Sequence, residues 1–220
     1  KNKLKATDDF ISFSAFVSFF PQLVAGPIER ATNLLPQFLN NRKFIYADAV
    51  YATKLIIWGF FMKLVVADRL AIYVDAIYNN YENHNSITLI TATIFFAFQI
   101  YCDFAGYSNI AIGCARLFGF KLMTNFRRPY FASNPSEFWR RWHISLSTWF
   151  RDYVYIPLGG SRYGNFKTYK NLMITFTISG LWHGANWTFV FWGAINGLYQ
   201  IIFNFFKQKN FRFNLILGGV

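Results

Sequence analysis

A histidine, His183, lies in the middle of a long apolar run, and it is the clearest candidate for chemistry in this sequence. The run covers residues 172–203 and contains no Asp, Glu, Lys or Arg. It is long enough to cross a bilayer, which needs about 20 residues. Because a titratable group at membrane depth is costly, one that is kept there is a candidate functional residue. Burial favours a neutral imidazole, so general-base catalysis is the first hypothesis.

The neighbours of His183 strengthen this hypothesis. If the segment is helical there, Ser179 lies one turn before the histidine and Asn186 one turn after it, so either side chain can fix the imidazole tautomer. Trp182 and Trp187 can form the walls of a pocket. The alternative is a histidine that bridges two helices by hydrogen bonds, and the residue types alone favour neither interpretation.

A second histidine, His143, lies in the segment 134–150, NPSEFWRRWHISLSTWF. Asn134 is a good N-cap, Pro135 suits the first helical position, and Glu137 completes a capping-box spacing. The pattern predicts one amphipathic helix at the membrane interface. Its aromatic face carries Trp139, Trp142, His143, Leu146, Trp149 and Phe150.

Two arginines and an aspartate are further candidates for ligand binding. Arg140 and Arg141 lie on other faces of the predicted helix and can bind phosphate, either of lipid headgroups, which we favour, or of an anionic acyl donor. Asp103 lies inside an apolar run, where pairing with Arg116 or Arg127 is favoured over binding a polar ligand. For His143, a structural hydrogen-bonded role is favoured from spacing alone.

The scattered histidines and cysteines do not predict a metal site. His84, His143 and His183 show no ligand spacing. Cys102 and Cys114 lie in apolar surroundings and are expected to be small buried hydrophobic residues.

The elements that must position these residues are membrane helices. The 220 residues are 54% hydrophobic and 22% aromatic, and only 15% are charged, against about 25% in a typical soluble domain. The net charge of +12 comes from basic residues between apolar runs, which indicates lipid headgroups rather than nucleic acid. We therefore predict an all-α, multi-span membrane protein, with residues 1–220 forming part of a single domain. The expected membrane segments cover about 10–26, 49–66, 87–118 and 172–203.

The last two apolar runs pose a problem of length and orientation. Each covers 32 residues, about 48 Å as a straight helix, which exceeds the hydrocarbon core of about 30 Å. Each run is therefore expected to be tilted or broken, with breaks at Gly106 and at Gly180 or Gly184. Both flanks of 172–203 are basic, the second through Lys207, Lys209 and Arg212. If the run crosses once, these flanks give conflicting orientations, so orientation is left open.

The chain begins with Lys rather than Met and is expected to be a piece of a larger protein. Four of its longer stretches are FFPQLVAGPIER (19–30), YCDFAGYSNIAIGCARLFGF (101–120), NFRRPYFASNPSEFWRRWHISLSTWFRDYVYIPLGG (125–160) and SGLWHGANWTFVFWGAINGLY (179–199). Together these stretches resemble the membrane-bound O-acyltransferase family, and its alginate O-acetylation branch in particular.

The resemblance implies a fold and an activity. His183, in LWHGANW, matches the catalytic histidine of the family, and His143, in WRRWHISLS, its second characteristic histidine. The family fold implies helices around a tunnel through the cell membrane. The substrate would be an acyl donor, acetyl-CoA or an acylated carrier protein, with no bound cofactor. The acceptor would be an extracytoplasmic polysaccharide such as alginate, and a separate extracytoplasmic acetyltransferase is an expected partner.

The resulting hypothesis is O-acetyl transfer with His183 as general base toward an acceptor hydroxyl. Trp182, Asn186 and Trp187 would shape the site, and Arg140 and Arg141 would lie at the donor side. Three alternatives remain: His183 as a covalent acyl carrier, a transporter without chemistry, and a scaffold that recruits another transferase.

Overall fold

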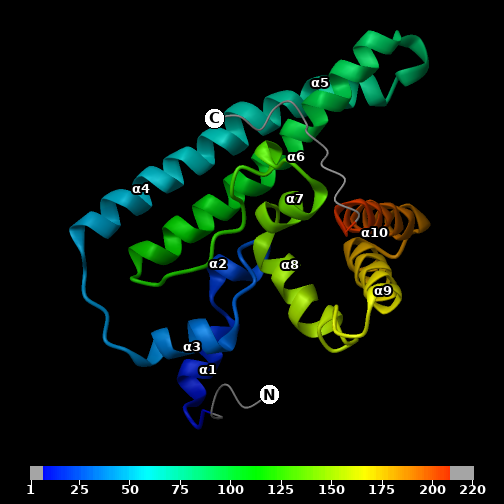
Figure 1. Cartoon of the computed structure of the whole chain (residues 1–220). Coiled ribbons are helices and arrows are strands. Elements are labelled where there is room, and N and C mark those ends of the chain that lie inside the picture. Colours follow the sequence, from blue (N-terminus) through cyan, green and yellow to red (C-terminus); the bar gives the residue numbers. More distant parts are fainter. Residues whose placement is uncertain (1–6, 209–220) are drawn as a thin grey trace. The chain divides into compact units, whose positions relative to one another are not determined.

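The computed structural model describes residues 7–208, all of whose regular elements are helical (Figure 1). Residues 1–125 and 126–220 form two compact units, which are described separately. Within the described residues, two helices are long and apolar enough to cross a membrane, α6 (Ser86–Leu117) and α10 (Trp187–Gln208). The all-helical class is therefore confirmed, whereas the single domain stays a prediction.

The first unit is built around two long antiparallel helical segments. One runs without interruption through α4 (Tyr46–Phe60), the π-helix η1 (Phe61–Ala67) and α5 (Asp68–Tyr78). The chain then turns through the short 3-10 helix η2 (Tyr81–Asn83) and returns as α6. The segment expected at 49–66 therefore continues as one helical run to Tyr78.

Helix α6 is a single helix, so the break expected at Gly106 is wrong. Gly106 instead allows close packing, because a Cβ placed there would lie 2.8 Å from the carbonyl oxygen of Gly59 in α4. The same contact is tight from the other side, since a Cβ on Gly59 would lie 2.6 Å from the Gly106 oxygen. Small residues at this crossing let the two backbones approach each other, as is common between membrane helices.

Ion pairs join the same helices. Asp48 in the first turn of α4 accepts hydrogen bonds from Arg116 of α6 at 2.7 and 3.1 Å. Lys63 pairs with Asp68 at 3.0 Å and also with Asp103. The expected pairing of Asp103 is thus confirmed, but the partner is Lys63 rather than Arg116 or Arg127. Lys63 lies within the π-helix η1, a distortion that sequence periodicity does not reveal.

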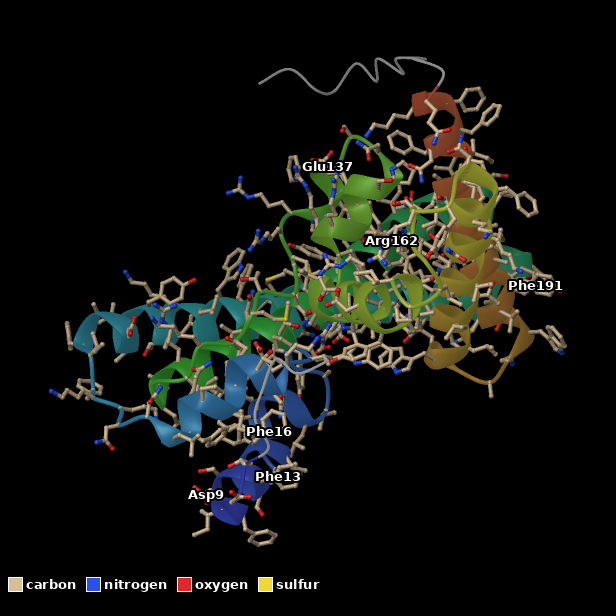
Figure 2. The ribbon with its side chains drawn as sticks, turned by 60° about the horizontal axis from the view of Figure 1, so that its bottom comes forward. Asp9, Phe13, Phe16, Glu137, Arg162 and Phe191 are labelled. Atoms are coloured by element: carbon tan, nitrogen blue, oxygen red, sulfur yellow. The ribbon has the colours of Figure 1, made fainter. Side chains whose placement is uncertain are left out.

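The expected apolar segment 10–26 is divided. It contains α1 (Phe10–Val17) and α2 (Phe20–Leu23), followed by α3 (Ala31–Leu39). Asp9 caps α1 by accepting hydrogen bonds from the backbone amides of residues 11 and 12. Phe16 of α1 packs against a buried cluster, whereas Phe13 is half exposed (Figure 2). The cluster consists of Phe19, Leu34, Ala115 and Phe120.

In the second unit, the apolar run 172–203 folds back on itself. It contributes the end of α9 (Asn165–His183) and most of α10, which lie antiparallel and side by side (Figure 1). The break expected near Gly184 is confirmed, since α9 ends at His183. Asn165 begins α9 and Gln208 ends α10, and the Asn165 amide donates a hydrogen bond of 2.8 Å to the Gln208 side-chain oxygen.

This hairpin removes the conflict over orientation. Lys167 and Lys170 at the start of α9 lie at the same end of the pair as Lys207 at the end of α10. Both basic flanks therefore lie at one end of the pair, so their charges no longer point to opposite orientations. Lys209 and Arg212 of the basic tail lie outside the described residues.

The predicted helix 134–150 is two helices, so the expectation of one continuous helix is wrong. Helix α7 (Pro135–Arg141) begins after the 3-10 helix η3 (Pro129–Phe131), and α8 (Ile144–Phe150) continues into the π-helix η4 (Arg151–Tyr155). The break falls at His143, whose backbone is left-handed with φ 42°. A single residue in this conformation ends the helical hydrogen-bond ladder and turns the chain.

Candidate active site

The second unit contains a cavity of about 740 Å³ between α7, α8, α9 and α10. Helix α9 lines it with Leu172, Thr175, Phe176, Ser179 and His183. These positions recur every three or four residues, so they form one stripe along the helix. The stripe leads to His183 at the end of α9, so the cavity runs along the helix toward this histidine.

His183 is held at the cavity by aromatic rings. Its imidazole lies 5.0 Å from the Trp192 ring and 6.3 Å from the Phe189 ring, measured between centroids. A Cβ on Gly184 would lie 2.6 Å from the Phe189 ring, so a glycine at position 184 leaves the space that this ring occupies. More than a third of His183 is exposed in the described chain, which leaves its imidazole accessible from the cavity.

His143 lines the same cavity from the junction of α7 and α8. Only 6% of its surface is exposed. Burial, and to a lesser extent the nearby His183 imidazole, lowers the pKa of His143 to about 4. The side chain is therefore neutral at pH 7. A left-handed backbone is uncommon for a residue with a side chain, and such conformations gather at functional sites.

Helix α7 is fixed by its cap and by an ion pair. Asn134 accepts a hydrogen bond from the Glu137 amide at 2.8 Å, as the sequence predicts. Glu137 accepts from the amide and the hydroxyl of Ser133, and it pairs with Arg141. These contacts lower the pKa of Glu137 to about 2. Arg141 is thus engaged within α7, whereas Arg140 lines the cavity together with Arg127 and Arg151.

The model of the family described as MBOAT, membrane-bound O-acyltransferase, matches residues 2–215 of this sequence. The chain belongs to the membrane-bound O-acyltransferase family. It is 45% identical over 197 residues to the probable alginate O-acetylase AlgI of Pseudomonas putida, covering 90% of this chain and 40% of that protein.

Two further relatives have other names. The peptidoglycan O-acetyltransferase of Helicobacter pylori is 39% identical over 213 residues, which are 96% of this chain and 40% of that protein. The teichoic acid D-alanyltransferase of Bacillus subtilis is 31% identical over 209 residues, which are 89% of this chain and 52% of that protein. The chain therefore spans between two fifths and about half of the length of these relatives.

Among the residues predicted to form the pocket of this membrane-bound O-acyltransferase, Trp182 contacts both histidines. Its ring lies 6.3 Å from that of His143 and 5.1 Å from that of His183. Trp187, by contrast, is 75% exposed and packs against Phe191, which points away from the α9–α10 pair (Figure 2). Neither Trp182, which is 55% exposed, nor Trp187 is among the residues that line the cavity.

Two other predicted residues, Asn186 and Asp103, have side-chain partners other than the two histidines. Ser179 and His183 lie one turn apart on α9, as expected. Asn186 comes after the end of this helix, so it does not continue the expected polar stripe. The Asn186 side chain accepts hydrogen bonds from the amide and the hydroxyl of Thr188 and caps α10. Asp103 belongs to the first unit, where it pairs with Lys63.

Sequence reasoning missed several cavity residues, of which Ser136 and Gln200 are the most informative. Ser136 of α7 donates a hydrogen bond of 2.7 Å to the side-chain oxygen of Gln200 in α10. Both residues line the cavity, as does Asn204 one turn further along α10. A glutamine and an asparagine four residues apart, within an apolar run, were the signal that could have found this polar edge.

Proposed function

We propose that the full-length protein is a membrane-embedded O-acyltransferase that moves an acyl group, most simply acetyl, to hydroxyls of an extracytoplasmic polysaccharide. The observation that carries this proposal is the meeting of His143 and His183 in one cavity of a chain that belongs to an acyltransferase family. The names of the relatives, which act on alginate, peptidoglycan and teichoic acid, support a cell-surface polymer as the acceptor.

In the proposed reaction, His183 removes the proton from an acceptor hydroxyl. The oxygen attacks the acyl carbonyl of a thioester, a C–O bond forms, and the C–S bond breaks. The leaving thiolate then takes the proton from the His183 imidazolium, so that protons and electrons balance. The donor would be acetyl-CoA or an acylated carrier protein, and an extracytoplasmic acetyltransferase would be the partner that completes transfer to the polymer.

The environment supports distinct roles for the two histidines. His183 is accessible, as a general base must be to reach its substrate. His143 is buried and neutral, so it can give or accept a hydrogen bond without adding charge. Trp182 lies against both rings and would hold them apart at a fixed distance. Arg127 and Arg140 provide positive charge around the same cavity, which suits a phosphate-bearing donor, whereas Arg151 pairs with Asp152 at 2.9 Å.

The test is surface-glycan O-acetylation in cells that carry the full-length gene. We compare wild type with His183→Ala and His183→Gln at matched membrane expression, and use His84→Gln in the loop between α5 and α6 as the control. Loss of acetyl ester in both His183 variants, with the control unchanged, supports the proposal. Retained acetylation would contradict the catalytic role and favour a transporter or a scaffold. A rapid-quench search for acyl-histidine distinguishes the general base from the covalent carrier.

A further inference from the structure

Gln200 carries an unused hydrogen-bond donor at the cavity wall. Only 5% of this residue is exposed, and it lines the cavity. Its oxygen accepts the hydrogen bond from Ser136, but its Nε2 has no partner among the described residues. Because a buried polar group without a partner costs free energy, the fold alone gives no reason for an amide at this position.

The position of the amide limits what can bind it. Trp192, whose ring contacts His183, precedes Gln200 by eight residues on α10, which corresponds to about 12 Å along the helix axis. A molecule that reacts at His183 and also reaches Gln200 must therefore be extended. The cavity provides such a path, since the stripe from Leu172 to His183 on α9 spans 11 residues, or about 16 Å.

The charge pattern indicates which substrate lies at this end. Gln200 is near the end of the α9–α10 pair that carries Lys167, Lys170 and Lys207, the cytoplasmic end by the positive-inside rule. Activated thioesters are formed in the cytoplasm, whereas surface polymers are outside. The Gln200 amide is uncharged, so it suits a neutral acceptor oxygen better than a phosphate, for which the arginines of the cavity are better partners.

We propose that Gln200, oriented by Ser136, donates a hydrogen bond to a carbonyl oxygen in the arm of the acyl donor, about 12 Å from the reacting centre at His183. This inference rests on the proposed acyl transfer and adds a binding residue to it. Gln200 is a positioning residue rather than a catalytic one, because it holds the donor at a distance from the atoms that react.

The test compares two acetyl thioesters on the full-length protein in proteoliposomes. S-acetyl-pantetheine carries amide carbonyls in its arm, whereas S-acetyl-octanethiol has an arm of carbon atoms only. Gln200→Leu is expected to raise KM for S-acetyl-pantetheine about tenfold, or about 1.4 kcal/mol, with kcat within threefold. KM for S-acetyl-octanethiol is expected to stay unchanged. Equal effects of the variant on both thioesters would overturn the inference.

Asn196→Leu is the matched control. Asn196 lies one turn before Gln200 on α10, its amide donates to the carbonyl oxygen of Trp192 at 2.8 Å, and it does not line the cavity. This variant is expected to leave both KM values within twofold. A tenfold rise in KM for S-acetyl-pantetheine in this variant would show that any lost amide on α10 has the same effect, and would also overturn the inference.

A stability measurement separates binding from structure. Without ligand, Gln200→Leu is expected to melt somewhat below wild type, because it loses the hydrogen bond from Ser136, so each ligand shift is measured from the ligand-free melting temperature of the same protein. The thioether S-ethyl-pantetheine should raise the melting temperature of wild type but not of Gln200→Leu. This shift needs no catalysis, so it tests Gln200 even if wild type transfers no acetyl group and the proposed function fails. Equal shifts in the two proteins would refute the role of Gln200.

Discussion

The contact between α9 and α10 gives the sharpest prediction, because it fixes the place of His183. A Cβ added to Gly180 would overlap the carbonyl oxygen of Phe189 in α10, and it would lie 3.2 Å from the Cα of Gly193. The overlap with the oxygen is about 0.8 Å relative to the 3.0 Å limit for real Cβ contacts. Both neighbours are backbone atoms, so Gly180→Ala must move the helices apart.

The expected magnitude follows from two opposing effects. Alanine in place of glycine favours a helix by about 1 kcal/mol. Overpacking against a rigid backbone costs about 1–3 kcal/mol, and this overlap belongs at the upper end. We therefore expect Gly180→Ala to destabilise the protein by about 2 kcal/mol. His183 follows three residues later on the same helix, and a displacement of about 1 Å at a catalytic group can reduce the rate about 100-fold.

Gly197→Ala is the control in the same helix pair. Its Cβ would lie 3.2 Å from the sulfur of Met173 and 3.2 Å from the Cβ of Phe176, and the flexible methionine can yield. We expect a change in stability of less than about 1 kcal/mol, because the gain in helix propensity offsets the tight contact. Thermal unfolding of the purified full-length variants and O-acetylation in cells measure both effects. If Gly180→Ala and Gly197→Ala behave alike, the close approach of the two helices is refuted.

Three further predictions concern pH, helix capping and an ion pair. The pKa of His143 is near 6.5 in the unfolded chain but only about 4 in the folded chain. A neutral His143 therefore contributes about 3 kcal/mol to folding stability above pH 6.5, and this contribution is lost as pH falls toward 4. The unfolding midpoints of wild type and His143→Gln, measured between pH 4 and 7, should converge at low pH, and parallel curves would contradict this. Asn134→Ala should cost about 1 kcal/mol through loss of the α7 cap, measured as a lower melting temperature, whereas no change would show that the cap is dispensable. For the half-buried pair of Asp48 and Arg116, Asp48→Asn should destabilise by about 1 kcal/mol in low salt and by less in high salt, and an effect independent of salt would exclude a charge interaction.

The sequence predicted the features that depend on local signals. Asn134 and Pro135 mark the start of α7, and Gly184 marks the end of α9, because capping and chain reversal are set by the residues at those positions. The same reasoning failed at His143, where the sequence continues a helical pattern while the backbone turns left-handed. No local residue requires that turn, so it follows from the packing of the aromatic face around it.

The rest of the site depends on contacts between distant segments. His143 and His183 were each recognisable from their motifs, but their common cavity depends on how α7 and α8 pack against α9. Gln200 lies 64 residues from Ser136 in sequence, and only the fold brings them within hydrogen-bond distance. Asp103 was expected to pair with a cation, yet the choice of Lys63 depends on the antiparallel packing of two helices.

The reversal of the chain between α9 and α10 also bears on how this part of the protein enters the membrane. If α9 enters the membrane together with α10, the residues that cross the bilayer ahead of the two helices are 181–188, LWHGANWT, which contain no Asp, Glu, Lys or Arg. Each charged residue at the centre of a span costs about 2.5–3.5 kcal/mol during insertion, so this tip passes without that cost when His183 is neutral. The histidine at the cavity is thus the one side chain at the tip whose protonation would oppose translocation. Insertion of the two helices as a pair and general-base chemistry at His183 would thus both require an uncharged imidazole.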